Sequence, residues 1–244
     1  MSESLKRGID ALLYLSTRKS VGVTELADEL DVNKSTAFRI LNTLLESGLV
    51  EKNKETATYK LGAAILRLSE RYYKNFYTIT VALPIMKRLS VEISESVHLA
   101  IASNTGAIVV EQVMCEGTAV NAKIGHNEPL HCSSVGKCLL TFSTVADGKN
   151  LLKSVVYDKY TDKTLTDEKS LLKEIEKIRK DGFAVDNGEL DADIRCVAVP
   201  VYNNFGDCIY SLGVSGTANK MTDSRIEKIV PSLLRASKDM ALRG

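Results

Sequence analysis

The stretch NKSTAFRILNTLLESG, residues 33–48, has the pattern of a short amphipathic helix with an unusual polar face. Asn33 is a suitable N-cap, and an apolar arc follows at helical spacing, formed by Ala37, Ile40, Leu41, Leu44 and Leu45. The opposite arc carries hydroxyl, amide and guanidinium groups, from Ser35, Thr36, Arg39, Asn42 and Thr43, together with Glu46 and, in the first turn, Lys34. An ordinary solvated face carries mainly lysine and glutamate, so this set of donors needs an explanation.

The flanking sequence predicts a small helical domain that ends in a β-hairpin. An apolar stripe marks a first helix, formed by Leu5, Ile9, Leu12 and Leu13. A second helix from about Thr24 leads through the short link DVN into the stretch above. After Gly48, a suitable C-cap, LVEKN and TYKLG flank KETA as two short strands and a tip. This order is the pattern of a winged helix-turn-helix, and it argues against a merely solvated polar face.

Composition limits the class of protein. The 244 residues are enough for one or two domains of ~100–200 residues each. A formal net charge of +1 argues against a protein that coats nucleic acid indiscriminately, but it permits a specific reader with locally placed basic groups. No apolar run reaches the roughly 18–20 residues that span a bilayer, and MSESLKRGID lacks the apolar core of a signal peptide. Five cysteines without a CxxC pair favour a reducing compartment, so we expect a soluble cytoplasmic protein.

The rest of the chain predicts a second domain of a different kind. Residues 63–95 are expected to form helices that connect the two domains, with Pro84 starting or kinking the second of them. From Ser96, SVHLAIA and AIVVEQV form a hairpin around SNTG, and TAVNAKIG is a further candidate strand. SVGKCLLTF and TDEKSLLKEIEKIRKDG read as helices, the latter capped by Thr166 and ended by Gly182.

CVAVPVY and CIYSLGVSG form a second hairpin around NNFGD, and TDSRIEKIVPSLLRASKDMA is a closing helix. We therefore predict a multi-domain α+β protein. A winged helix-turn-helix occupies residues 1–62, a helical connector 63–95, and an α+β domain with a mainly antiparallel sheet 96–244.

Several segments carry a family resemblance. VTELADELDVNKSTAFRILNTLLESGLVEKN, followed by YKLG, resembles the N-terminal winged helix of IclR-type bacterial transcription regulators. IGHNEPLHCSSVGKCLL, IRKDGFAVDNGELDADIRCVAVPVYNNFGD and SLGVSGTANKMT resemble that family's GAF-like effector-binding domain. The resemblance implies a DNA-binding regulator, repressor or activator, that is modulated by a small metabolite and acts as a homodimer or homotetramer on an operator. It implies no cofactor, no membrane partner and no enzyme activity.

For the DNA-binding half, a recognition helix in the major groove explains the polar face of the opening stretch. Ser35 and Thr36 suit phosphate or base contacts near the helix start, where the helix dipole favours an anion. Arg39 is the candidate for bidentate guanine readout and Asn42 a candidate adenine reader. Phosphate contacts are expected from the helix start and the wing, through Lys34, Lys52 and Lys54.

For the effector half, the resemblance places a small organic or aromatic acid in a pocket beside the sheet. The implied lining residues are Val120, Ser134, Val135, Gly136, Asp186, Ile194, Cys196, Gly213 and Ser215. Free N–H groups where SSVGK begins a helix form an anion site without a basic side chain. Gly213 stands where many members have a hydroxyl residue, which is expected to enlarge the pocket. Glu128 stands where members of the family often have an apolar residue. If its side chain points into the pocket, it disfavours binding of a ligand carboxylate at that end of the pocket.

Each of these residues also has a structural interpretation. Gly136 suits close helix packing, and Val120, Ile194 and Cys196 suit a hydrophobic core. Asp186 is either purely structural or suited to a ligand that bears hydroxyl groups.

Two other classes of protein stay open as alternatives. The first is a hydrolase that uses Ser134 or Cys132. Ser134 and Lys137 have the Ser-x-x-Lys spacing of an acyl-enzyme nucleophile. No SDN or KTG partner motif follows, so this is the weaker hypothesis. The second alternative is a metabolite- or metal-binding sensor whose helix-turn-helix binds another protein and not DNA. Its metal ligands would come from His98, His126, His131, Cys132 and Cys196. None of these pairs has the close spacing of a structural zinc site, so no metal is expected.

Overall fold

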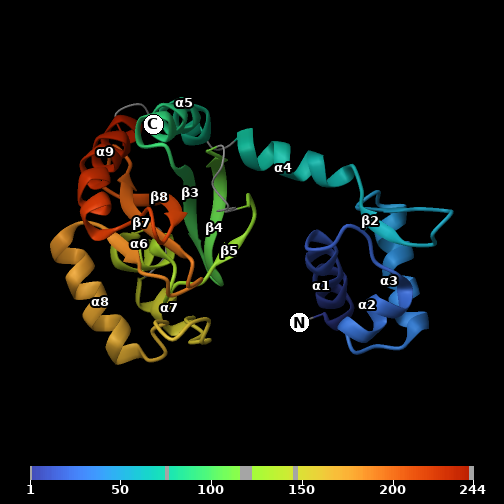
Figure 1. The fold of residues 1–244 in the computed structure, drawn as a ribbon. Helices are drawn as coiled ribbons and strands as arrows, with labels where there is room; N and C mark the ends of the chain where they lie inside the picture. The colour runs from blue at the N-terminus through green and yellow to red at the C-terminus, as the bar shows by residue number, and fades with distance from the viewer. Residues whose placement is uncertain (1, 75–76, 116–122, 145–147, 242–244) are drawn as a thin grey trace. The chain divides into compact units, whose positions relative to one another are not determined.

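The computed structural model describes residues 2–74, 77–115, 123–144 and 148–241. The chain divides into two compact units, Met1–Phe76 and Tyr77–Gly244. Figure 1 shows a small bundle of helices with a hairpin in the first and a curled sheet between helices in the second. The division falls between α4 (Ala64–Lys74) and α5 (Tyr77–Ile93), inside the segment that we expected to be a connector. Among the described residues, no helix has both the length and the apolar character needed to span a bilayer.

The first unit confirms the winged helix-turn-helix. Its elements are α1 (Glu3–Ser16), α2 (Val23–Glu29), α3 (Lys34–Glu46), β1 (Val50–Lys52) and β2 (Tyr59–Leu61). Asn33 caps α3 as expected, since its side chain accepts a hydrogen bond from the Thr36 amide at 2.8 Å. Leu15, Leu26 and Leu41 form the core together with Tyr59 from the wing. Leu45, which we placed on the apolar arc of α3, is instead 36% exposed.

The second unit is built on one antiparallel sheet with the strand order β5-β4-β3-β8-β7-β6. The strands are β3 (Ser96–Ser103), β4 (Gly106–Val113), β5 (Asn127–Glu128), β6 (Ala184–Asp186), β7 (Ile194–Tyr202) and β8 (Cys208–Thr217). Both predicted hairpins are confirmed as β3–β4 and β7–β8. The first and last of these strands along the chain, β3 and β8, pair in the middle of the sheet, with Ser96 opposite Ser215.

Helices cover both faces of this sheet. The helices are α6 (Ser134–Phe142), α7 (Gly148–Lys153), α8 (Glu168–Asp181) and α9 (Asp223–Ala241), in addition to α5. α9 packs on β7 and against α5, whereas α6 packs on β7 and β8 and contacts α8 (Figure 1). Because side chains alternate along a strand, Gly213 and Ser215 share one face of β8, while Leu212 and Val214 share the other. Val135 and Leu139 of α6 form a buried cluster with Ala198 of β7.

Four local expectations need correction or completion. α5 begins at Tyr77 and contains Pro84 in its interior, so Pro84 does not start this helix. Asp167, not Thr166, caps α8, because Asp167 Oδ1 accepts from the Ser170 amide at 2.9 Å. Most of the candidate strand TAVNAKIG lies outside the described residues, and residues 123–125 are not a strand. α7 and the three-residue strand β6 were not predicted.

Candidate functional site

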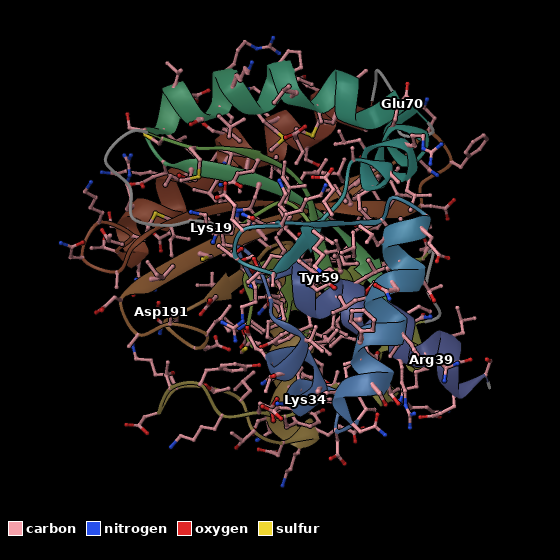
Figure 2. All side chains as sticks on the ribbon, turned by 90° about the vertical axis from the view of Figure 1, so that its right-hand side faces the viewer. Lys19, Lys34, Arg39, Tyr59, Glu70 and Asp191 are labelled. Carbon is pink, nitrogen blue, oxygen red and sulfur yellow. The ribbon has the colours of Figure 1, made fainter. Side chains whose placement is uncertain are left out.

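The polar face of α3 is accessible. Lys34, Ser35 and Arg39 are exposed, and Thr36 and Asn42 are half-buried. Figure 2 shows Lys34 at the start of α3 and Arg39 further along the same helix. The structure therefore presents the five predicted reading residues of α3 from one capped helix.

Ser35 differs from the expectation in one chemical respect. Its hydroxyl donates to Asn33 Oδ1 at 2.7 Å, so the hydroxyl proton is already used within the helix cap. The lone pairs of the Ser35 oxygen remain available. In this arrangement the Ser35 oxygen can accept a further hydrogen bond, but its proton is not free to be donated.

The wing carries Lys52 and Lys54, both exposed as predicted for phosphate contacts. Lys52 Nζ lies 5.3 Å from the centroid of the Tyr59 ring, within the range of a cation–π interaction. At the tip, Asn53 Oδ1 accepts from the Glu55 amide at 2.9 Å and holds the turn that presents Lys54. Both lysines are thus presented by an ordered hairpin.

Phe38 is an exposed residue of α3 that sequence reasoning did not select. Its side chain is 43% exposed, although an aromatic residue in a leucine-rich helix is normally counted as core. It lies between Ser35 and Arg39 in sequence, near the helix start that approaches DNA in this motif. An apolar ring at that place is suited to contact with a thymine methyl group.

The first unit also contains an apolar groove between α1 and α3. Its volume is about 830 Å³, and both helices line it, α3 through Thr36, Arg39, Ile40, Thr43 and Leu44. Leu5 is 64% and Ile9 48% exposed on its α1 side. The predicted apolar stripe of the first helix is therefore only partly buried within one chain.

In the second unit, the predicted effector residues come together on the sheet face beneath α6. Asp186 of β6 lies opposite Cys196 of β7, which lies opposite Ser215 of β8. The Ser215 hydroxyl donates to Cys196 Sγ at 3.0 Å. Ile194 is half-buried two residues before Cys196, and Ser134 and Val135 are buried in the first turn of α6. Val120 lies outside the described residues.

Gly136 fits the structural interpretation given above, that of close helix packing. A Cβ at this position would lie 2.4 Å from the Pro129 carbonyl oxygen, so the glycine is required for close packing. Its amide donates to the Ser133 side chain at 3.0 Å and is not free to bind an anion. Among the hydrogen bonds of the described residues, none uses the amides of Ser134 or Val135, as is usual in the first turn of a helix.

The expected enlargement of the pocket at Gly213 is wrong, because the imidazole of His98 fills the space. A Cβ on Gly213 would lie 2.3 Å from His98 Nε2 and 2.8 Å from Val135 Cγ1. His98 is buried near the start of β3, and within the described part of the chain its Nδ1 has no hydrogen-bond partner. Burial lowers the pKa of His98 to about 4, so the ring is neutral at neutral pH. From the sequence, His98 is predicted only as a candidate metal ligand.

Carboxyl groups dominate the charge around this face. Asp186 Oδ1 accepts from the Glu189 amide at 2.7 Å, and burial raises the pKa of Asp186 to about 7. Glu128 is buried, with Oε1 3.1 Å from Nδ1 of the largely exposed His126. The fully buried Lys137 donates from Nζ to Glu189 Oε1 at 2.6 Å. The nearest buried cation is therefore already neutralised.

The same contacts weigh against the enzyme and metal alternatives. Lys137, which would have to act as the base of a Ser-x-x-Lys pair, is ion-paired with Glu189 and lies 3.8 Å from Glu174. Burial raises the pKa of the Cys132 thiol well above its ordinary range, which disfavours a thiolate nucleophile. Across the residues that the structure describes, no three His, Cys, Asp or Glu side chains are arranged to hold a metal ion.

Comparison with known families agrees with this architecture. Residues 4–54 match the IclR helix-turn-helix domain, and residues 70–242 match the C-terminal domain of bacterial transcriptional regulator IclR. The HTH-type transcriptional repressor AllR of Salmonella typhi is 30% identical over 92% of this chain and 83% of its own length.

Solved structures show the same fold over the whole chain. The Thermotoga maritima IclR structure has a TM-score of 0.75 at 26% identity, covering 100% of this chain and 99% of that one. An IclR homologue from Microbacterium hydrocarbonoxydans, complexed with 4-hydroxybenzoate, has a TM-score of 0.82 at 21% identity, covering 99% and 98%. With an exposed recognition helix, a wing and a separate α+β unit all in place, the chain belongs to the IclR family of bacterial transcriptional regulators.

Proposed function

We propose that this cytoplasmic regulator binds a roughly palindromic operator as a homodimer through α3 and the wing, and that a small organic acid bound beneath α6 changes its operator affinity. The observation that carries the DNA-binding part is the exposed face of α3. Arg39 is free to form a bidentate contact with guanine, and Asn42 lies one turn further on. Lys34, Lys52 and Lys54 supply phosphate contacts on either side.

The exposed apolar side of α1 supports assembly into a dimer. Leu5 and Ile9 form an apolar surface on this helix that a second copy of the chain would cover. A two-fold dimer places two recognition helices on two half-sites, which enlarges the small footprint of a single domain. Pairing of two such dimers would give a homotetramer.

Effector control follows from the position of the buried polar residues in a separate unit. A ligand held by the amides of Ser134 and Val135 changes DNA affinity only if it binds the DNA-competent state and its alternative unequally. Effector and operator affinities must then be coupled reciprocally, with α4 and α5 as the connecting elements. The homologue crystallised with 4-hydroxybenzoate shows that a protein of this fold accommodates an organic acid.

A fluorescence-anisotropy titration tests the DNA-binding part. The full chain is titrated against the DNA upstream of its own gene and against a scrambled duplex of equal length, at two salt concentrations. We expect a preference of about a thousandfold for the native fragment. Arg39→Ala should reduce this preference by a factor of about 5 to 150, whereas the matched control Arg179→Ala, an exposed arginine of α8, should retain it. Equal and steeply salt-dependent binding to both duplexes would contradict specific recognition of this operator.

A further inference from the structure

We infer that Phe38 is a base-reading residue of α3, and that its ring recognises the C5-methyl group of a thymine in each operator half-site. This inference rests on the proposed operator binding and adds to it the readout of an apolar group. The residue that makes this readout lies outside the predicted set of polar readers. The inference also places that thymine within about two base pairs of the adenine that Asn42 is expected to read.

The first argument is that the core of the first unit does not account for the Phe38 side chain. The buried residues of α3 are Ala37, Leu41 and Leu44, whereas Phe38 is 43% exposed. An aromatic side chain that is left in water forgoes much of the stabilisation that burial would give it. The exposed part of the ring is therefore available to a partner.

The second argument is that the apolar groove between α1 and α3 does not account for this side chain either. Thr36 and Ile40 line that groove, and each is two residues from Phe38 in sequence. Because a helix turns by about 100° per residue, Phe38 points about 160° away from each of them around the helix axis. A partner seated in that groove would therefore leave Phe38 uncovered.

The third argument is the position of the ring among the predicted readers. Ser35, Phe38 and Asn42 follow one another at i, i+3 and i+7, so they are neighbours on one strip of the helix surface. Side chains on a helix lean towards its N-terminus, so we expect the ring of Phe38 to cover the turn that contains Ser35. In a helix-turn-helix, this early turn of the recognition helix meets the base edges.

The fourth argument is the chemistry of the phenyl ring. The ring has no hydrogen-bonding atom, so against most base edges it would cover polar groups without pairing them, which is unfavourable. In the major groove, the C5-methyl group of thymine is the apolar feature that distinguishes one base from the others. Thymine is therefore the base that Phe38 can contact with the smallest loss of hydrogen bonds.

The spacing along α3 links this contact to Asn42. Four residues of helix rise by about 6 Å, which is close to two base-pair steps of about 3.4 Å each. When α3 lies along the major groove, the thymine at Phe38 and the adenine at Asn42 are thus about two base pairs apart. Each operator half-site should contain a thymine and an adenine at this separation.

Deletion of single methyl groups from the DNA tests the inference with the full chain. The duplex is the fragment upstream of the protein's own gene or, if that fragment is not preferred over scrambled DNA, the sequence enriched from a pool of random duplexes. Each thymine is replaced in turn by 2′-deoxyuridine, which removes only the methyl group, and affinity is measured by fluorescence anisotropy. At a sensitive position, duplexes with cytosine and with 5-methylcytosine repeat the comparison in a different base pair.

We expect one thymine in each half-site at which loss of the methyl group weakens binding about fourfold, the factor that corresponds to burial of one methyl-sized group. For the wild-type protein, 5-methylcytosine at that position should bind more tightly than cytosine. Asn42→Ala should relax discrimination at an adenine within about two base pairs of that thymine.

Three variants at phenylalanine positions assign the effect to one ring. Phe38→Ala should bind the thymine and deoxyuridine duplexes equally, whereas Phe38→Leu keeps an apolar contact and should retain part of the preference. Both are first compared with the wild-type protein by circular dichroism. The matched control Phe205→Ala removes a ring that is 91% exposed in the second unit, and it should retain the full preference.

Two results would overturn the inference while specific operator binding stands. A specifically bound duplex in which every thymine tolerates loss of its methyl group would show that Phe38 reads no methyl group. An equal loss of affinity for the thymine and deoxyuridine duplexes in Phe38→Ala would assign the ring to support of the helix. If neither the native fragment nor the random pool gives a specifically bound duplex, the proposed DNA-binding function fails and the inference fails with it.

Discussion

Asp186 and His98 give the stability of the second unit two opposing dependences on pH. Burial raises the pKa of Asp186 from 3.8 to about 7, so between these values the folded protein keeps a proton that the unfolded chain has released. The contribution of Asp186 to the free energy of unfolding therefore falls as the pH rises. Burial lowers the pKa of His98 from 6.5 to about 4, so in that window the unfolded chain binds the extra proton. The contribution of His98 accordingly rises with pH.

The size of each effect follows from the number of pH units involved. A proton that is bound in only one of the folded and unfolded states changes the free energy of unfolding by about 1.4 kcal/mol per pH unit. In the wild-type protein the two slopes nearly cancel between about pH 4 and pH 6.5. Asp186→Asn removes the falling contribution, so its stability relative to wild type should rise by up to about 3 kcal/mol across this window. His98→Gln removes the rising contribution, so its relative stability should fall by a similar amount.

Thiol labelling measures the stability of the second unit without interference from the first unit, because all five cysteines lie in the second. Cys132, Cys138 and Cys208 are buried and react only when this unit opens. Pulses of 4,4′-dithiodipyridine across a urea series then give the unfolding midpoint at each pH. Ser215→Ala, which alters the same polar cluster without a titrating group, should run parallel to wild type. If the two variants shift in the same direction with pH, the assignment of these protonation states is refuted.

Three further substitutions test other parts of the structure. Arg39→Ala should weaken operator binding by roughly 1–3 kcal/mol and relax specificity at one base position, measured by anisotropy with single-base operator variants; a uniform loss across all variants would indicate a phosphate contact instead. Lys137→Met leaves Glu189 buried without its partner and should destabilise the second unit by about 3–5 kcal/mol in the thiol assay, whereas the double variant Lys137→Met/Glu189→Leu should recover part of that loss. Asn33→Ala removes the cap of α3 and should lower the stability of the first unit by about 1 kcal/mol in urea unfolding followed by circular dichroism; no change would mean that the 2.8 Å bond to Thr36 contributes nothing.

Much of the fold could be predicted because its signals are local. Asn33, Gly48 and Gly182 mark helix ends through backbone geometry that is determined by a few neighbouring residues. The two hairpins of the sheet are likewise local, because turn-forming residues separate two strand patterns in the sequence. β6 was missed since three residues carry too little periodicity, and its pairing with β7 depends on tertiary contact. The cap of α8 was misplaced by one residue, within the ordinary uncertainty of adjacent Thr and Asp caps.

The candidate sites were predictable to different degrees. The polar face of α3 follows from helical spacing alone, because its core side is fixed by Ala37, Leu41 and Leu44. The place of His98 does not follow from spacing, because it depends on the pairing of β3 with β8 and on the missing side chain of Gly213. The exposure of Phe38 and the burial of Lys137 contradict the usual preferences of these residue types. Only the assembled structure shows which neighbours permit those exceptions.

The central pairing of β3 with β8 has a kinetic consequence. Ser96 and Ser215 are about 120 residues apart in sequence, so forming the middle of the sheet requires a large loop closure before its contacts are made. In the first unit, by contrast, α2, α3 and the hairpin are sequential neighbours with mostly local contacts. The DNA-binding unit should therefore acquire its structure earlier than the sensing unit during refolding. For a short time a refolding chain would be able to bind DNA before it could respond to an effector.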